Sequence, residues 1–397
     1  MDKKKILIVG ASVLQLPAIL KAKEMGFYVG VADYNPKAIG IPYADEYFNV
    51  STIDVEGVTK VAQSFLPEGI MLLATDMPMR AIAAASEACH LPGISYETAV
   101  KATDKAEMIK AFEANGVEHP WYFIAGDKAA FEVILDQVTF PCIMKPTDNA
   151  GSRGVVLAHD LNELKAAYDY SHGESRSGAI IIEEYLQGPE FSVEVMVVDG
   201  EPHVLQITDK LTTGAPHFVE MGHSQPTSQN EDNQAKIKSL AIRACKAVGI
   251  NCGPAHVEMI LTEDGPKMVE LGARMGGDCI TTHLVPLSTG IDMVEATIDV
   301  ACGKKPDIEH KFSKGSAIRF FRTSAGLLKS VEGIEEAEQI PGVREITIVK
   351  KIGTMITDIG SSVDRIGFVV AQADSAEEAV RVCEKAVGTI KITIEAV

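Results

Sequence analysis

The first 95 residues alternate between short apolar runs and amphipathic stretches. Residues 4–12 (KKILIVGAS), 28–35 (YVGVADYN) and 69–76 (GIMLLATD) have the continuous apolar character of strands buried on both faces. Residues 16–27 (LPAILKAKEMGF) and 81–91 (AIAAASEACHL) have the spacing of helices. Strands that alternate with helices predict a doubly wound parallel sheet in this part of the chain.

The rest of the chain mixes helices with antiparallel hairpins. Residues 103–116 (TDKAEMIKAFEANG) predict a helix capped near Thr103, and residues 191–207 (FSVEVMVVDGEPHVLQI) predict a hairpin with Asp-Gly at its turn. Residues 207–230 show no clean period, so we expect a long irregular segment of the kind that lines sites. The pattern over residues 364–394 is strand, helix, strand. We therefore expect an α/β protein with three domains, at residues 1–95, 96–300 and 301–397.

Two glutamates flank a predicted hairpin turn. Residues 255–261 (AHVEMIL) and 267–272 (KMVELG) predict two strands, and the Glu-Asp-Gly-Pro between them has turn chemistry. Glu258 and Glu270 are symmetric about Asp264, so antiparallel pairing should bring their carboxylates together. Two like charges at such a short distance favour a shared cation such as Mg²⁺. This ion takes carboxylate oxygens and shares its other coordination positions with phosphates. The alternative is an exposed hairpin with incidental glutamates.

A lysine and a glycine-bearing loop suggest triphosphate binding. Lys145 ends the apolar run at residues 140–146 (FPCIMKP), and a loop with Ser152, Arg153 and Gly154 follows it. Small residues let backbone N–H groups approach phosphates, and the ammonium balances their charge. The lysine precedes the glycines, so this is not a Walker A loop. The alternative is a solvated lysine before a flexible turn.

An acidic segment follows the next predicted strand. Residues 179–186 (AIIIEEYL) end in Glu183, Glu184, Tyr185 and Leu186, and Glu190 comes soon after. A strand that turns into a short connector can offer backbone groups to an adenine edge, while a nearby carboxylate accepts ribose hydroxyls. Consecutive glutamates on a solvated surface are the alternative.

The start of the chain resembles a dinucleotide site only loosely. Gly10 follows the first strand and Asp33 ends the second, but the second and third glycines of the fingerprint are absent. Without them a pyrophosphate could not approach the backbone closely. A structural turn, or a site for part of a substrate, fits better than nicotinamide binding.

Composition narrows the class of protein. With 46% hydrophobic and 23% charged residues the chain has an ordinary globular composition, and its formal charge of −18 argues against nucleic acid or an anionic membrane as a partner. The basic start precedes only a short apolar run, so we expect no secretory leader, and no stretch has the ~18 apolar residues of a membrane helix. The seven cysteines are scattered without zinc spacing. A cytoplasmic protein with reduced thiols is expected.

The order of these features resembles the ATP-grasp ligases over nearly the whole chain. Lys105, in ATDKAEM, and Lys145 resemble the two phosphate lysines of that family, and GSRGV resembles its flexible phosphate-covering loop. The resemblance implies an adenine connector at EEYL, a ribose-binding acid at Glu190, and a mobile lid at about residues 120–186. It also implies an α+β ATP-grasp fold that binds ATP with Mg²⁺, or with Mn²⁺ in its place. Glu258 and Glu270 resemble the metal ligands, and Arg274 resembles the arginine that steadies the transferred phosphoryl group.

One position departs from the family pattern. Many members have Asn two residues after the second glutamate as a further metal ligand, whereas this chain has Gly272. We expect water or substrate to complete the coordination there.

Within the family, ELGARMGGD, PHFVEMGH and GPAHVEM resemble the L-amino acid ligases more than the purine-pathway enzymes. His217, Glu220 and His223 are candidates to line a substrate pocket, with ordinary polar loop residues as the alternative. Asp278 is a candidate partner for a substrate ammonium. His256 shares the face of the metal ligands, as a supporting or as a structural histidine.

The implied activity is ATP-dependent joining of a carboxylate and an amine, with an amino acid among the substrates. It would proceed through an acyl phosphate with release of ADP and phosphate. The resemblance also implies a homodimer. Two alternatives are a purine-pathway member that acts on a ribonucleotide amine, and a nucleotide-binding protein without turnover. A persuasive basic cluster for a ribonucleotide phosphate is absent from the sequence outside the ATP site.

Overall fold

The computed structural model describes residues 3–149, 151 and 153–396. Its N-terminal part is a parallel four-stranded sheet of order β3-β2-β1-β4, as the apolar runs predicted. The strands are β1 (Lys5–Val9), β2 (Tyr28–Ala32), β3 (Glu46–Phe48) and β4 (Gly69–Met71). The helices around them are α1 (Leu16–Glu24), α2 (Val55–Phe65), α3 (Met79–Ala88) and α4 (Tyr96–Lys101), with a 3-10 turn η1 (Ile41–Tyr43).

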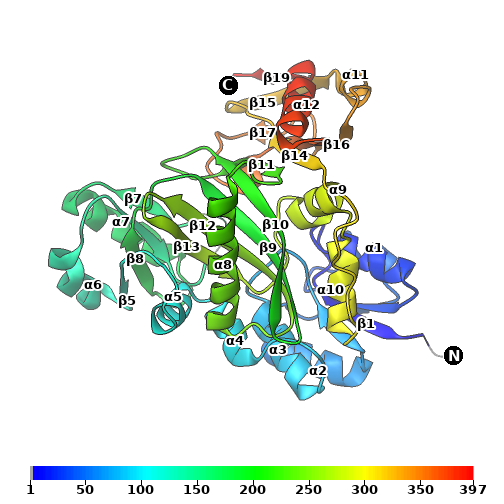
Figure 1. The fold of residues 1–397 in the computed structure, drawn as a ribbon, viewed down its shortest axis with the longest axis horizontal. Helices are drawn as coiled ribbons and strands as arrows, with labels where there is room; N and C mark the ends of the chain where they lie inside the picture. The colour runs from blue at the N-terminus through cyan, green and yellow to red at the C-terminus, as the bar shows by residue number, and fades with distance from the viewer. Residues whose placement is uncertain (1–2, 150, 152, 397) are drawn as a thin grey trace.

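A small antiparallel sheet forms the part that we expected to be a lid, and Figure 1 shows it as a separate lobe beside the central sheet. Its strand order is β5-β8-β6-β7, and its own core includes Phe131, Met144 and Ile182. The strands are β5 (Tyr122–Ala125), β6 (Cys142–Pro146), β7 (Val156–Ala158) and β8 (Ile180–Glu184). The helices are α6 (Lys128–Ile134), η2 (Leu135–Gln137) and α7 (Leu161–Glu174).

A large antiparallel sheet runs through the centre of the molecule (Figure 1). Its strand order is β13-β12-β9-β10-β11-β14-β18-β16, so strands from the C-terminal region continue the same sheet. Its strands up to residue 272 are β9 (Glu190–Val198), β10 (Glu201–Thr212), β11 (Glu220–Gln225), β12 (Gly253–Thr262) and β13 (Gly265–Gly272). Helices α5 (Lys105–Ala114) and α8 (Glu231–Val248) pack on it, and their apolar faces join its core.

The C-terminal part completes the large sheet and adds a three-stranded sheet of order β17-β15-β19. Its strands are β14 (Gly315–Phe320), β15 (Gly326–Glu332), β16 (Val343–Ile348), β17 (Met355–Ile356), β18 (Gly367–Ala373) and β19 (Lys391–Glu395). Its helices are η3 (Ile280–Leu284), α9 (Val285–Thr289), α10 (Met293–Ala301), α11 (Ile334–Glu338), η4 (Ser362–Asp364) and α12 (Ala376–Thr389). Of all the described helices, none is long and apolar enough to cross a membrane.

One sequence expectation needs correction. Residues 207–230 are not irregular throughout, because β10 extends to Thr212 and β11 occupies Glu220–Gln225. Lys210, Glu220 and His223 line a cavity rather than a core, so polar residues replace part of the apolar alternation that marks a strand. The helix predicted to be capped near Thr103 is confirmed: its N-cap is the adjacent Asp104, whose carboxylate accepts from the N–H groups of Ala106 and Glu107.

Two polar side chains fix the turns at the carboxyl ends of the N-terminal strands. The Asp33 carboxylate accepts from the backbone N–H groups of Ala11 at 2.7 Å and Asn35 at 2.8 Å, so it fixes two turns. The buried Gln15 side chain bonds both backbone groups of Leu73 at 2.6 Å. These contacts support the structural-turn interpretation.

Candidate functional site

The two glutamates of the hairpin lie opposite each other, as predicted, but the geometry depends on a bulge. Near the turn, Thr262 pairs with Gly265 and Met259 with Met268, which would place Glu258 opposite Val269. The register shifts at this point, so Val269 is the extra residue and Glu258 faces Glu270. The turn consists of two residues, Glu263 and Asp264, so a regular ladder would not be symmetric about Asp264. The extra residue makes the Glu258–Glu270 pair symmetric about Asp264, as the sequence suggested.

The site occupies one face of the large sheet. Side chains two residues apart along a strand share a face, so His256 joins Glu258 on β12, and Glu190 and Glu194 share a face of β9. On β11, Met221 is an extra residue between the pairs Thr212–Glu220 and Leu211–Gly222. This second bulge accounts for Glu220 and His223 lining the same cavity in spite of their odd spacing.

Lys105 and Glu270 join the central helix α5 to the hairpin. The Lys105 ammonium lies 3.0 Å from Glu270 Oε1 and donates to the Asn149 carbonyl at 2.8 Å. A lysine in the first turn of a helix opposes the helix dipole, so the carboxylate is needed to hold it there. Burial, the largest single effect, would lower the pKa of Lys105, but the carboxylates of Glu270, Asp76 and Glu183 together raise it.

Lys145 forms a second buried ion pair. Its ammonium lies 2.6 Å from Glu183 Oε2, and both side chains are only 8% exposed. The pair connects β6 and β8, which are neighbouring strands of the small sheet. Next to it, Glu184 pairs with Lys267 at 2.9 Å, which ties the connector to the hairpin.

Nearly all of the predicted nucleotide residues line one cavity between the small sheet and the large one. Its walls include the apolar side chains of Ile143, Leu186, Ile260 and Met268. The predicted residues among those that line it are Lys105, Lys145, Arg153, Glu183, Glu184, Tyr185, Leu186, Glu190, Glu258 and Glu270.

The glycine-bearing loop borders this cavity through Gly151 and Arg153. Gly154 has a φ of +76°, and a Cβ there would lie 2.6 Å from Pro146 Cγ, so the backbone conformation and the packing both require glycine. Asp148, at the start of the loop, accepts from the backbone N–H groups of Arg176 and Ser177. Ser152 lies outside the described residues.

A second, polar cavity adjoins the first and shares Gly151, Glu220, Glu258 and Glu270 with it. Its further lining residues include Asp76, Lys210, His223, His256, Gly272, Arg274, Asp278 and Ser362. The hairpin glutamates therefore lie at the junction of an apolar-walled cavity and a highly charged one.

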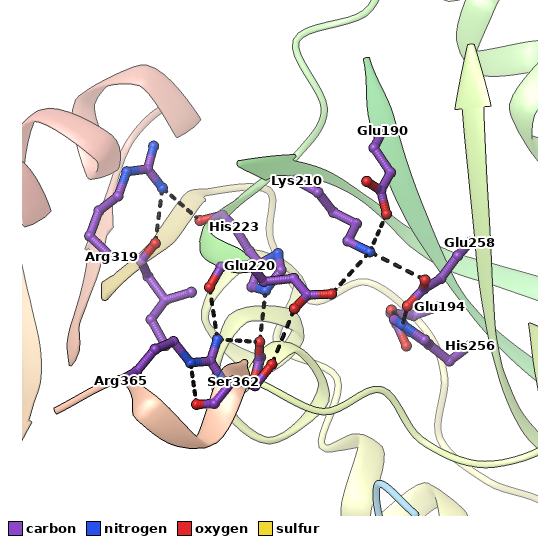
Figure 2. A network of polar contacts seen from close by, with 12 residues as sticks. Glu190, Glu194, Lys210, Glu220, His223, His256, Glu258, Arg319, Ser362 and Arg365 are labelled. Atoms are coloured by element: carbon purple, nitrogen blue, oxygen red, sulfur yellow. Dashed lines mark hydrogen bonds and ion pairs between the residues drawn. The ribbon is translucent and has the colours of Figure 1, made fainter. Parts of the chain in front are cut away.

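Lys210 holds three acids together at this junction, and the sequence did not single it out. Its buried ammonium lies 2.5 Å from Glu190, 3.3 Å from Glu258 and 3.7 Å from Glu220 (Figure 2). Burial alone would lower the pKa of Lys210, but the three carboxylates raise it well above its ordinary value. The acids come from three different strands, so only the folded sheet reveals the cluster.

His256 bridges the buried Glu194 and the cavity-facing Glu258. Its Nδ1 lies 2.7 Å from Glu194 Oε1 and its Nε2 lies 2.9 Å from Glu258 Oε1 (Figure 2). Burial would lower the pKa of His256, but the two carboxylates raise it to about 9. Burial would raise the pKa of Glu258, whereas Lys210, His256 and Arg274 hold it well below its usual range. His256 therefore supports Glu258 directly.

Arg274 makes a two-point ion pair with Asp76, which follows β4 and was not predicted. Arg274 Nε lies 2.7 Å from Asp76 Oδ1, and Nη2 lies 3.2 Å from Oδ2. A Cβ on Gly272 would lie 2.8 Å from Asp76 Oδ1 and 3.0 Å from the Arg274 guanidinium carbon. Glycine at position 272 thus leaves room for this pair, and no side chain from that position reaches the hairpin glutamates.

Asp278 lies at the far end of the polar cavity, held by the C-terminal part. The two terminal nitrogens of Arg365 each donate to one Asp278 oxygen at 2.7 Å, and His223 Nε2 lies 3.5 Å from Asp278 Oδ2. Burial would raise the pKa of Asp278, but Arg365 and His223 hold it well below its ordinary value. Ser362 donates to Glu220 at 3.3 Å. Arg365 and Ser362 are separated from the hairpin by about 90 residues of sequence and were not predicted.

His217 is the predicted substrate residue that the structure does not bring to the others. Its side chain is exposed between β10 and β11, and it lines neither cavity, whereas its neighbour Phe218 lines the first.

The carboxylates of Glu258 and Glu270 fit a metal ion that also binds the phosphates of a nucleotide. Among the described residues, no group of three or more His, Cys, Asp or Glu side chains could hold a metal ion. The two paired carboxylates at the junction of both cavities supply two oxygen ligands and leave the other positions to phosphates and water, which is the usual arrangement for Mg²⁺.

Comparison with known proteins agrees with this geometry. Residues 138–282 match the ATP-grasp domain, and residues 319–395 match the L-amino acid ligase C-terminal domain 2. The uncharacterized protein y4rH of Sinorhizobium fredii is 28% identical over 351 residues, which are 86% of this chain and 69% of that protein. The alanine–anticapsin ligase of Bacillus subtilis is 27% identical over 323 residues, 75% of this chain and 67% of that protein.

Among solved structures, the L-amino acid ligase of Bacillus licheniformis shares the fold. The TM-score is 0.84 at 22% sequence identity, with the whole of both chains covered. The ATP-grasp fold predicted from the sequence is therefore confirmed. Residues 138–282 thus match an ATP-grasp domain, and residues 319–395 match a C-terminal domain of the L-amino acid ligases.

Proposed function

We propose that this protein is an ATP-dependent carboxylate–amine ligase that forms an amide or peptide bond with an amino acid among its substrates. The observation that carries the proposal is the pair of adjoining cavities that share Glu258 and Glu270. One cavity has the apolar walls and lysines suited to a nucleotide, and the other has the charges suited to a small zwitterion. A phosphoryl group at the junction would be in reach of both.

In the first cavity, Lys105 and Lys145 would neutralise the phosphates. The backbone of Glu184 to Leu186 would receive the adenine edge, and Glu190 would accept ribose hydroxyls. Arg153 and Gly154, with Ser152, would cover the phosphates and exclude water from the acyl phosphate. The resemblance supports all of these assignments, and the shared cavity supports those of Lys105, Lys145, Arg153, Glu184 to Leu186 and Glu190.

A divalent metal ion, with Mg²⁺ first and Mn²⁺ as a substitute, would neutralise phosphate charge when bound. Glu258 and Glu270 would hold it, and Gly272 would leave its remaining positions to water or phosphate. His256 and Lys210 keep Glu258 ionised and in place.

In the reaction, a substrate carboxylate oxygen would attack the γ-phosphorus while the bond to ADP breaks, which gives an acyl phosphate. The amine nitrogen would then attack the acyl carbon, lose a proton, and release phosphate. The protein's part is to position the reactants and stabilise the developing charge. Arg274, oriented by Asp76 and facing the polar cavity, is suited to that role.

Glu220, His223 and Asp278 would contact the amino acid substrate. The Asp278 side chain is 24% exposed, so its carboxylate can accept from a substrate ammonium although it is also paired with Arg365. His217 remains a prediction that its exposed position does not support.

The alternatives are weaker. A purine-pathway role would not account for the match of residues 319–395 to an L-amino acid ligase domain. A scaffold without turnover would not need so many compensated charges at one junction. The seven free thiols favour a reducing compartment, so we propose a cytoplasmic location, and the resemblance favours a homodimer.

The test is ADP release with pairs of L-amino acids and small amines in the presence of ATP and Mg²⁺. At least one pair should stimulate release, and Glu270→Ala should abolish it while the fold is kept. Glu263→Ala, in the exposed turn of the same hairpin, is the matched control and should keep normal turnover. Normal turnover of Glu270→Ala would overturn the metal assignment. Tight ATP binding without ADP release for any pair would favour the scaffold.

A further inference from the structure

A third cavity lies on the other face of the large sheet, between that sheet and the C-terminal helix α12. It shares none of the residues that line the two cavities of the proposed active site. Its chemistry is mixed, with two arginines, one glutamate and several aliphatic walls: Leu211, Arg319, Arg322, Val387, Ile392 and Glu384.

Arg319 is the central charge of this cavity and is poorly compensated. Its side chain is only 13% exposed, and its Nε has no hydrogen-bond partner among the described residues. Glu384, which is 63% exposed, approaches Nε only to 3.9 Å. Burial lowers the pKa of Arg319, and this effect exceeds the support from neighbouring groups. Within the described residues the guanidinium makes hydrogen bonds through Nη1 only, to the carbonyls of Ile318 and His223, and such a partly satisfied guanidinium at a cavity wall is suited to receive an anion.

The sheet makes room for this arginine. Gly222 is the register partner of Arg319, and a Cβ on Gly222 would lie 2.7 Å from Arg319 Nη1. The neighbouring pair, His223 and Ile318, points to the other face because side chains alternate along a strand. Arg319 Nη1 also donates to the His223 carbonyl at 3.2 Å (Figure 2). Arg319, a wall residue of the third cavity, therefore contacts the backbone of His223, which lines the polar cavity.

We propose that this third cavity binds an α-amino acid with an apolar side chain as an effector distinct from the substrates. Arg319 and Arg322 would take the carboxylate, Glu384 would take the ammonium, and Leu211, Val387 and Ile392 would contact the side chain. A short peptide presents the same three groups, so a free amino acid and a dipeptide product are the two sources to distinguish. Because Arg319 bonds the His223 carbonyl, occupancy would alter the position of β11 beside the substrate.

The experiment is calorimetric titration of the full chain with L-leucine, without ATP. Asp278→Asn perturbs the polar cavity and should still bind leucine in the third cavity. Arg319→Gln should weaken leucine binding at that cavity by about tenfold or more. Arg319→Gln should bind ATP normally. Glu384→Gln, at the exposed mouth, should weaken L-leucine but not N-acetyl-L-leucine, which lacks the ammonium. Glu377→Gln, an exposed glutamate of the same helix, is the matched control and should bind as the wild type does.

Titration with L-leucyl-L-leucine distinguishes the two sources, because tighter binding of the dipeptide than of leucine would identify the product as the ligand. Unchanged leucine affinity in both Arg319→Gln and Glu384→Gln would overturn the proposal. The absence of leucine binding to the wild type at 10 mM would also overturn it, because that concentration is roughly a hundredfold above the dissociation constant of a site with a Kd of about 0.1 mM. If Arg319→Gln does not fold, Glu384→Gln and Arg322→Gln decide the question. The measurement needs no turnover, so its outcome is independent of the proposed ligase activity.

Discussion

The Asp76 carboxylate pairs at two points with the Arg274 guanidinium, through contacts of 2.7 Å and 3.2 Å. Asp76 follows the last strand of the N-terminal sheet, and Arg274 follows the hairpin of the large sheet. The pair therefore joins two parts of the molecule at the wall of the polar cavity. Its planar geometry fixes the direction of the guanidinium, which a single contact would not do.

Gly272→Asn should disrupt this pair. The added Cβ would lie 2.8 Å from Asp76 Oδ1, so the carboxylate or the guanidinium must move. We expect destabilisation of ~1–3 kcal/mol and a fall in ADP release of at least ~10-fold. Denaturant unfolding and the ADP assay measure the two effects. Gly126→Ala is the control, because an added Cβ there would meet no heavy atom within 4 Å and Gly126 lines neither cavity. Equal effects of the two substitutions would refute the role given to position 272.

Lys145→Met should destabilise the protein and remove ATP binding. The change leaves Glu183 buried without its cation, which costs about 3–5 kcal/mol in comparable pairs. Lys267→Met removes a more exposed pair with Glu184 and should cost less than ~1 kcal/mol. Adding Glu183→Gln to Lys145→Met should restore stability but not ATP affinity. Recovery of both would mean that Lys145 has only a structural role.

The Arg365–Asp278 pair should give the protein a pH-dependent share of its stability. The folded pKa of Asp278 lies below its unfolded value near 3.8, so the pair's contribution is complete above about pH 5 and declines as the pH falls toward the folded pKa. The difference in unfolding free energy between the wild type and Arg365→Met should therefore shrink as the pH falls from 6 to 3.5. A difference that stays constant over this range would contradict the coupling.

Native cysteines should react slowly with alkylating agents. Burial raises the pKa of all seven thiols, and the pKa of Cys142 reaches about 11. At pH 8 a thiol of that pKa is about one part in a thousand thiolate, against roughly a quarter for a free cysteine. Iodoacetamide should label the unfolded protein quickly and the native protein slowly, with the native rate rising with pH. Rapid stoichiometric labelling of the native chain at pH 8 would be the contrary result.

Local patterns in the sequence predicted the parts of the site that are close along the chain. The paired glutamates, Lys145 at the end of β6 and the Glu183 connector all follow from a strand and the turn beside it. The doubly wound sheet followed from apolar runs in the same way.

The remaining parts depend on contacts between distant segments. Lys210 belongs to the site because three acids from β9, β11 and β12 converge on it. Asp76 belongs to the site because Gly272 leaves space for the Asp76 carboxylate. Arg365 reaches Asp278 only because β14 continues the large sheet beyond β11. No local periodicity reports such a contact.

The extra residue at Val269 makes the length of one strand part of the chemistry. Because side chains alternate, a regular ladder over the same residues would put Val269 opposite Glu258 and turn Glu270 toward the opposite face. The bulge is therefore what keeps the two acids side by side. Substitutions in the turn at Glu263 and Asp264 leave this register intact, whereas one codon inserted between that turn and Glu270, with the ladder otherwise kept, would turn Glu270 away from Glu258.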